Sequence, residues 1–372
     1  MKILFITNNL PPLVDGVGDY TYNIAKQFMR HNHEVYIICR NNPQINTNVL
    51  GITILPIINK WNCNCYKPII NVIKNNSIDV VSLQYVPHGY HPKGLPLGLI
   101  PMVRTIKKTG VKIMIFFHEV CIDYHGWNIK RTLCSWGIKY IAKELIKNSD
   151  FVATSIEHYV KRIQELHKNI NVPAIRIVSN IPNHTYNKAY LKHLKDKIAP
   201  NGEFIILFFG KRNVHYQVEA IQELISQGYK IIVLSLGNTY FLSQNYKIPI
   251  YRTGLLDINE LSQFFQIADC FCLPENEESG ATFKSGSLAA GLQYGLPIIT
   301  NSGFMTENTL MNGINILFVK ANDKDSFKKE LIHLMKDKLF AKNISNNARN
   351  IGKTLTWDNT YKHYINLITN SL

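Results

Sequence analysis

The residues from Phe283 to Thr300 combine a basic turn, small residues and the start of a predicted helix. Lys284 supplies a full positive charge, Gly286 lets a ligand approach the backbone, and Ser287 can cap the helix. The first amides of a helix have no partners within it and carry partial positive charge, so they can bind a phosphate. Taken alone, the stretch fits an ordinary capped helix better than an anion site, because Lys-Ser-Gly turns are common.

A second glycine-containing loop follows the first apolar segment, where Gly16 and Gly18 open a helical pattern. Glycines at these positions would let the loop approach a ligand. The pattern is not a dinucleotide-binding fingerprint, because Thr21 stands in place of the third glycine. The second strand also ends in Cys39-Arg40, where that fingerprint needs an acidic residue.

The sequence Asp323-Lys324-Asp325 is a literal Asp-x-Asp, a pattern that can hold a metal beside a nucleotide. It precedes the periodic run 326–336, so we predict that its acids cap a helix and hold no metal. The seven cysteines are an odd number without zinc-site spacing. Cys270 and Cys272 would share one face of a strand as small apolar residues.

These candidate residues lie in a regular alternation of apolar strands and amphipathic helices. The segments predicted as strands in the first half are 2–7, 34–39, 52–57, 79–85, 112–117, 151–155 and 175–179. The second half has predicted strands at 204–210, 230–237, 269–274, 297–300 and 316–319. Its predicted helices are 214–227, 259–268, 286–294 and 326–336.

This rhythm is typical of an α/β chain with two doubly wound, Rossmann-like domains. The polar stretch 182–202 is rich in lysine and asparagine and interrupts the pattern, so we expect domains at 1–185 and 186–355. Open parallel sheets bind ligands beyond the carboxyl ends of their strands. The facing edges of two such domains would frame one cleft.

Composition narrows the function classes. The chain has 372 residues, of which 46% are hydrophobic, and no apolar run is long enough to span a membrane, so we expect a cytoplasmic protein. The net charge of +15 is concentrated in residues 1–185, which carry +11. Such a charge favours anionic ligands or surfaces. Nucleic acid ranks last among them, because no recognition module is present.

Five short motifs occur in an order that matches the predicted strand ends: Gly16–Thr21, Gln84–Pro87, Phe117–Glu119, Gly286–Ala290 and Gly295–Pro297. With these motifs, the chain resembles a glycosyltransferase family 4-like enzyme of GT-B fold over nearly its whole length. The resemblance implies a retaining, metal-independent transferase of the hexosyltransferase type. The donor, a UDP- or GDP-linked sugar, would be held mainly by the second domain. A glycan or lipid-linked acceptor would be held mainly by the first domain, to which a final helix at 356–372 would return.

The resemblance also implies roles for particular residues. His118, Lys211 and Arg212 would act in catalysis, His118 by hydrogen bonding to a sugar hydroxyl and the two cations by clamping the diphosphate. The expected donor-binding residues are Gly16, Gly18, Lys211, Arg212, Thr282, Lys284, Ser285, Gly286, Ser287 and Leu288. The expected acceptor-binding residues are Asp19, Gln84, Tyr85 and His88. A core histidine at 118 and a solvated basic turn at 211–212 are the plainer alternatives.

The chain departs from the family where two glutamates stand eight residues apart, because Thr282 and Ala290 occupy those positions. Gly286-Ser287-Leu288 fits a variant helix start, and the acids Glu275, Glu277 and Glu278 lie just upstream. Two other functions therefore stay open. One is a non-catalytic subunit that binds a sugar nucleotide, and the other is a sugar-nucleotide epimerase of the same fold.

The segment from Trp127 to Lys147 mixes aromatic, apolar and basic residues, among them Trp136, Tyr140, Lys130 and Arg131. A basic helix with aromatic side chains can lie on an anionic membrane. A core-packed helix with a solvated face is the alternative. With the charge of the first half, the pattern favours peripheral contact with the inner face of a membrane.

Overall fold

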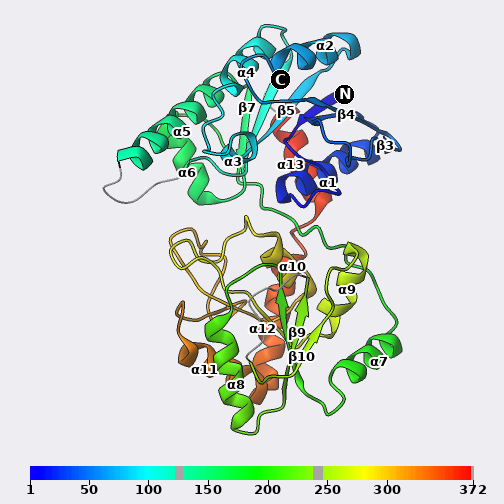
Figure 1. Ribbon diagram of the computed structural model, residues 1–372, viewed down its shortest axis with the longest axis vertical. Helices are drawn as coiled ribbons and strands as arrows, with labels where there is room; N and C mark the ends of the chain where they lie inside the picture. Colours follow the sequence, from blue (N-terminus) through cyan, green and yellow to red (C-terminus); the bar gives the residue numbers. More distant parts are fainter. Residues whose placement is uncertain (122–128, 238–245, 370–372) are drawn as a thin grey trace. The chain divides into compact units, whose positions relative to one another are not determined.

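Two compact units make up the computed structural model, which describes residues 1–121, 129–237 and 246–369, without the side chains of 129–131 (Figure 1). The first unit contains Met1–Arg176 and Trp357–Leu372, and the second contains Ile177–Thr356. The boundary between the two units therefore lies after Arg176, whereas the composition of the chain predicts it after residue 185.

A seven-stranded sheet with the order β3-β4-β2-β1-β5-β6-β7 forms the centre of the first unit. All neighbouring strands are parallel except β3, which pairs with β4 in the antiparallel sense. Every residue of β5 is buried, as expected for a central strand that is covered on both faces. The strands are β1 (Lys2–Ile6), β2 (Glu34–Arg40), β3 (Asn48–Val49), β4 (Ile52–Ile58), β5 (Val80–Tyr85), β6 (Lys112–Phe117) and β7 (Phe151–Thr154).

Helices connect these strands, and the last helix of the chain packs on the first (Figure 1). They are α1 (Gly16–Arg30), α2 (Tyr66–Asn76), α3 (Pro87–Tyr90), α4 (Leu99–Lys107), α5 (Ile129–Lys147), α6 (Glu157–Leu166) and α13 (Trp357–Thr369). Tyr364 of α13 is completely buried against Phe28 of α1 and Phe116 of β6. The final helix is therefore part of the core of the first unit.

The second unit has a six-stranded parallel sheet with the order β10-β9-β8-β11-β12-β13. Its strands are β8 (Phe204–Phe209), β9 (Ile231–Leu236), β10 (Ile250–Arg252), β11 (Cys270–Cys272), β12 (Ile298–Thr300) and β13 (Leu317–Phe318). Cys270 and Cys272 are both buried in the core, and burial raises the pKa of the Cys270 thiol. They act as the small apolar residues that their spacing predicts.

Side-chain caps set the start of several helices in the second unit. Its helices are α7 (Lys188–Ile198), α8 (His215–Ser226), α9 (Ile258–Ile267), α10 (Gly286–Tyr294), α11 (Lys324–Lys336) and α12 (Lys338–Gly352). Asp257 and Glu260 form a capping box at α9, and Asp323 accepts hydrogen bonds from the Asp325 and Ser326 amides at α11. The predicted cap at the Asp-x-Asp sequence is confirmed.

The predicted strand at residues 175–179 is wrong, and the polar stretch expected to hold the domain junction lies inside the second unit. Residues 175–179 are not a strand, because only Ala174 forms a bridge, with Thr154 of β7. The polar stretch 182–202 contains α7, which the side chain of Asn187 caps and which packs against α9. The high lysine and asparagine content of this stretch is typical of a linker, although the stretch forms a short helix that is buried at Ile198.

Candidate functional site

Two loops meet where the strand order of the second sheet reverses. From β8 the chain moves outward to β9 and β10, then returns to β11 on the other side of β8. Open parallel sheets bind ligands in the crevice at such a point. The loop after β8 carries Lys211 and Arg212, and the loop after β11 carries Glu275.

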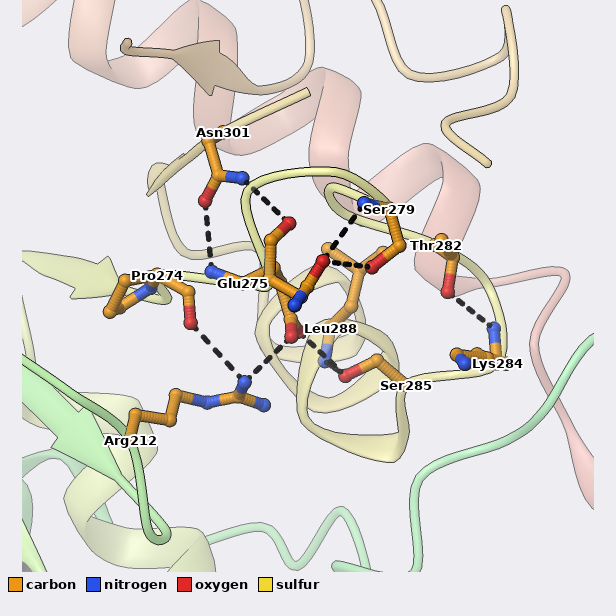
Figure 2. Close-up of polar contacts among 10 residues, drawn as sticks. Arg212, Pro274, Glu275, Ser279, Thr282, Lys284, Ser285, Leu288 and Asn301 are labelled. Carbon is orange, nitrogen blue, oxygen red and sulfur yellow. Dashed lines mark hydrogen bonds and ion pairs between the residues drawn. The ribbon is translucent and has the colours of Figure 1, made fainter. Parts of the chain in front are cut away.

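Arg212 and Glu275 form an ion pair across these two loops (Figure 2). Arg212 Nη1 lies 2.7 Å from Glu275 Oε2 and also donates to the Pro274 carbonyl at 3.3 Å. The two side chains are only 19% and 16% exposed. Arg212 Nε is buried and has no hydrogen-bond partner among the described residues. Lys211 is exposed beside this pair.

Ser285 links this ion pair to the start of α10. Its hydroxyl donates to Glu275 Oε1 at 3.2 Å and accepts from the Leu288 amide at 3.3 Å, so Ser285 is the N-cap (Figure 2). The prediction that Ser287 caps the helix is wrong, because the helix begins at Gly286. Within the described part of the chain, the amides of Gly286 and Ser287 have no hydrogen-bond partner, as the first amides of a helix require for anion binding.

The other predicted donor residues around α10 differ in exposure. Thr282 is 2% exposed, and its hydroxyl accepts from the Lys284 amide at 3.4 Å (Figure 2). Leu288 is completely buried, so only its backbone amide serves the site, through Ser285. Ala290 is also buried. The two positions where the family has glutamates therefore hold small or neutral side chains that pack into the protein.

A pocket of about 290 Å³ lies beside Arg212 at the carboxyl ends of β8, β11, β12 and β13. Glu275 and Asn301 also line it. Its walls include two buried polar atoms that have no partner among the described residues, Gln217 Oε1 and Thr300 Oγ1. Buried polar atoms of this kind are satisfied by water or by a ligand.

In the first unit, the glycine loop forms the start of α1 and packs closely against Asn9. Asp15 caps α1 and accepts from the Val17 amide at 2.9 Å and the Gly18 amide at 3.3 Å, so these amides are already bonded. A side chain at Gly18 would lie 2.5 Å from the Asn9 carbonyl oxygen, so glycine is needed there for close packing. Gly16 is exposed, with open space around it.

His118 follows β6 and lies in a buried polar network. Its Nε2 is 3.0 Å from Gln84 Oε1, and the Gln84 amide nitrogen donates to Ser82 at 2.9 Å and to Tyr364 at 3.4 Å. Burial lowers the pKa of His118 to about 3, so the ring is neutral at physiological pH. With Nε2–H donating to Gln84, Nδ1 is left as a hydrogen-bond acceptor.

The four expected acceptor residues fall into two groups. Gln84 and Tyr85 are completely buried, and Gln84 is occupied by His118. His88 is exposed on α3, and Asp19 is partly buried in the first turn of α1. Burial, followed by repulsion from Asp15, raises the pKa of Asp19 to about 6.

Family models match both halves of the chain. Residues 14–181 match "Glycosyltransferase Family 4", and residues 192–351 match "Glycosyl transferases group 1". This chain is a family 4-like glycosyltransferase of GT-B fold. No curated protein sequence gives a significant match.

Solved structures similar to this glycosyltransferase share its fold over their whole length. HepE of Anabaena in complex with UDP has a TM-score of 0.74 and 12% identity, with 100% of each chain covered. Sucrose-phosphate synthase from Thermosynechococcus elongatus has a TM-score of 0.73 and 13% identity, covering 100% of this chain and 98% of that one. A glycosyltransferase from Rickettsia africae has a TM-score of 0.70 and 17% identity, with the same coverage. Likeness at these identities shows the fold alone.

Helix α5 of the glycosyltransferase carries exposed apolar side chains. Leu133, Trp136 and Tyr140 are 58%, 67% and 54% exposed, and their spacing places them along one face of the helix. Trp127 and the side chains of Lys130 and Arg131 lie outside the described residues. Among the described residues, no helix is long and apolar enough to cross a membrane, and no cluster of potential ligands could hold a metal.

Two residues of these sites cannot be recognised from the sequence. Asn301 and Tyr364 carry no motif, and only their contacts with Glu275 and Gln84 identify them. Glu275 is one of three acids that lie just upstream of α10 in the sequence. Its position distinguishes Glu275 from the other two acids, because it directly follows the predicted strand 269–274. Ligands bind at such strand ends in open parallel sheets.

Proposed function

We propose that the enzyme transfers a hexose, with retention of anomeric configuration and without a metal, from a UDP- or GDP-linked sugar. The single observation that carries this proposal is the convergence of Arg212 and the unpartnered amides of Gly286 and Ser287 at the ligand-binding edge of the second sheet. HepE, a structure of the same fold, was solved with UDP and with UDP-glucose. Retention of configuration is proposed because the motifs resemble those of a family of retaining enzymes.

In this proposal, the second unit stabilises the departing diphosphate. Negative charge accumulates on the diphosphate as the bond to the anomeric carbon breaks. Arg212 and the first amides of α10 supply positive charge in fixed positions, and the exposed Lys211 adds a further charge, which together lower the barrier without a bound metal. The new bond forms to the acceptor oxygen on the same face of the sugar, and the acceptor proton passes to the leaving diphosphate.

His118 is proposed to orient the donor sugar as a neutral hydrogen-bonding group. A ring whose pKa is lowered to about 3 is a poor base at neutral pH, which argues against proton abstraction. Its free Nδ1 is suited to accept a hydrogen bond from a sugar hydroxyl. Gln84 would serve the reaction by fixing the ring, since the two side chains are 3.0 Å apart.

The acceptor is proposed to be a glycan or a lipid-linked sugar that binds the first unit near Asp19 and His88. Both side chains are at least partly accessible, in contrast to Gln84 and Tyr85. We further propose that the enzyme works in the cytoplasm against the inner face of a membrane. The exposed apolar face of α5 and the charge of +11 in residues 1–185 support this location.

Incubation with UDP-, GDP- and ADP-linked sugars tests the proposed reaction. We expect slow hydrolysis of one donor that continues in the presence of a chelator. Nuclear magnetic resonance, recorded before mutarotation, should show the released sugar in the donor's anomeric configuration. Release of the opposite anomer or a metal requirement would contradict the proposed mechanism. Binding without turnover would identify a non-catalytic subunit, and conversion of the nucleotide sugar itself would identify an epimerase.

A further inference from the structure

Glu275 bonds two elements that are proposed to hold the donor diphosphate. One carboxylate oxygen, Oε2, accepts from Arg212 on the loop after β8 at 2.7 Å. The other, Oε1, accepts from Ser285 at the N-terminus of α10 at 3.2 Å. Figure 2 shows the carboxylate between the two donors. A single side chain thus fixes the cation and the helix cap relative to each other.

Glu275 is itself held from a third strand end. Its backbone amide donates to Asn301 Oδ1 at 2.9 Å, and Asn301 follows β12 and is 4% exposed. The Asn301 amide nitrogen also donates to the Asn276 carbonyl at 3.2 Å. The carboxylate therefore occupies a defined position, which is what a side chain needs if it is to orient others.

The contacts of Glu275 set the geometry of both donors. The guanidinium group is a rigid fork, so a bond at Nη1 fixes the direction of its remaining N–H groups. At Ser285, the hydroxyl proton points to Glu275, which leaves the oxygen lone pairs for the Leu288 amide. Without the carboxylate, both Arg212 and the Ser285 hydroxyl could adopt other rotamers.

Electrostatics alone would give Glu275 the opposite effect. A carboxylate next to an anion site repels a diphosphate and offsets the charge of Arg212. If Glu275 were only a counter-ion, its neutralisation would strengthen the binding of anions. If it positions Arg212 and Ser285, its neutralisation weakens binding in spite of the more favourable charge. The two roles therefore predict opposite changes in anion affinity when Glu275 is neutralised.

We propose that Glu275 is a positioning residue for the diphosphate site and acts through Arg212 and Ser285. This inference rests on the proposed function, because it assumes that the site receives a diphosphate. Thr282 and Ala290 stand where the family has glutamates, so those positions provide no acid. Glu275 would be an acid that serves the site from a different position.

Calorimetric titration of UDP, GDP and inorganic pyrophosphate into the full-length protein tests the proposal. Glu275→Gln should weaken binding about tenfold and Glu275→Ala further, with thermal unfolding to verify that each variant is folded. Glu278→Gln is the matched control, because Glu278 is an exposed acid of the same loop, and it should change affinity less than twofold. Unchanged or tighter binding by Glu275→Gln and Glu275→Ala would overturn the proposal.

A double-mutant cycle with Arg212→Ala supplies a readout that a purely structural role would not move. In the Arg212→Ala background, Glu275→Gln should have a much smaller effect on affinity, because the group through which it acts is missing. Fully additive effects would contradict positioning through Arg212.

A resonance of Arg212 separates failure of this inference from failure of the proposed function. In arginine-labelled protein without ligand, the Nε–H signal of Arg212, assigned with Arg212→Lys, should shift or broaden in Glu275→Gln. An unchanged signal would show that Glu275 does not orient Arg212. If the wild-type protein binds none of the three anions while the signal does respond, the diphosphate site is wrong and the positioning of Arg212 by Glu275 stands.

Discussion

His118 shows how a buried network determines the chemistry of one residue. Tyr20 packs edge-on against its ring at a centroid distance of 4.9 Å, and Gln84 bonds its Nε2. Burial lowers its pKa because the charged imidazolium would lose its hydration inside the protein. The residue that sequence motifs mark as catalytic is therefore a neutral hydrogen-bonding group.

The lowered pKa makes stability depend on pH through His118. Below the ordinary value of 6.5, the unfolded chain takes up a proton that the folded ring, with a pKa of about 3, does not. The free energy of unfolding should therefore fall by about 1.4 kcal/mol for each pH unit below 6.5 from this residue alone. Urea unfolding of the wild type and of His118→Asn between pH 7 and pH 4.5 measures it, because the asparagine variant lacks this contribution. Parallel pH profiles of the two proteins would contradict the assignment.

Helix α5 is apolar on two faces, which is unusual for the covering helix of a sheet. Ile138, Ile141 and Leu145 are completely buried. On the opposite face, the exposed Leu133, Trp136 and Tyr140 continue at helical spacing into the exposed Lys143 and Lys147. Aromatic and basic side chains in one stripe fit the boundary between acyl chains and anionic headgroups.

Loss of the two aromatic side chains should therefore reduce membrane binding. In flotation assays with vesicles that contain phosphatidylglycerol, Trp136→Ser/Tyr140→Ser should bind about tenfold more weakly than the wild type, because less apolar area enters the bilayer. Pure phosphatidylcholine vesicles should bind neither protein well. Leu339→Ser, at a residue of α12 that is 69% exposed, is the control and should bind normally. Equal binding by the double variant and the wild type would rule out this face.

At the scale of the whole molecule, the first unit is discontinuous in sequence. Residues 357–372 follow the entire second unit, yet they belong to the first unit, where Tyr364 is buried beside Gln84. His31 and Tyr361 also stack, at a ring distance of 4.0 Å. The stability of the first unit therefore depends on the last residues of the chain.

Truncation after Thr356 should destabilise the first unit and leave the second intact. Removing even one large buried aromatic side chain costs about 3–5 kcal/mol, and the truncation removes all of α13. Scanning calorimetry should show one transition lost or lowered and another unchanged. The control is Lys362→Ala, which breaks only an exposed ion pair with Asp358 and should cost less than about 1 kcal/mol. A single, unshifted transition in the truncated protein would contradict this division.

Periodicity was sufficient to predict most of the sheet elements. The predicted strand 112–117 coincides with β6, and the predicted helix 286–294 coincides with α10, because the spacing of apolar residues is a local property. Residues 175–179 have the apolar pattern of a strand but form only one bridge, since pairing depends on a neighbouring strand. Helix α7 was missed because its lysines and asparagines are also typical of a linker.

The sequence by itself determined the family motifs and their places at strand ends, since both depend on neighbouring residues. It could not determine which side chains meet. Arg212 and Glu275 are 63 residues apart, and Gln84 and Tyr364 are 280 apart. Only the tertiary structure decided that Glu275 joins Arg212 to Ser285 at the start of α10, and that Gln84 lies between His118 and Tyr364. The reason is physical: hydrogen bonds and ion pairs form between groups that folding brings within about 3 Å, whatever their separation in the chain.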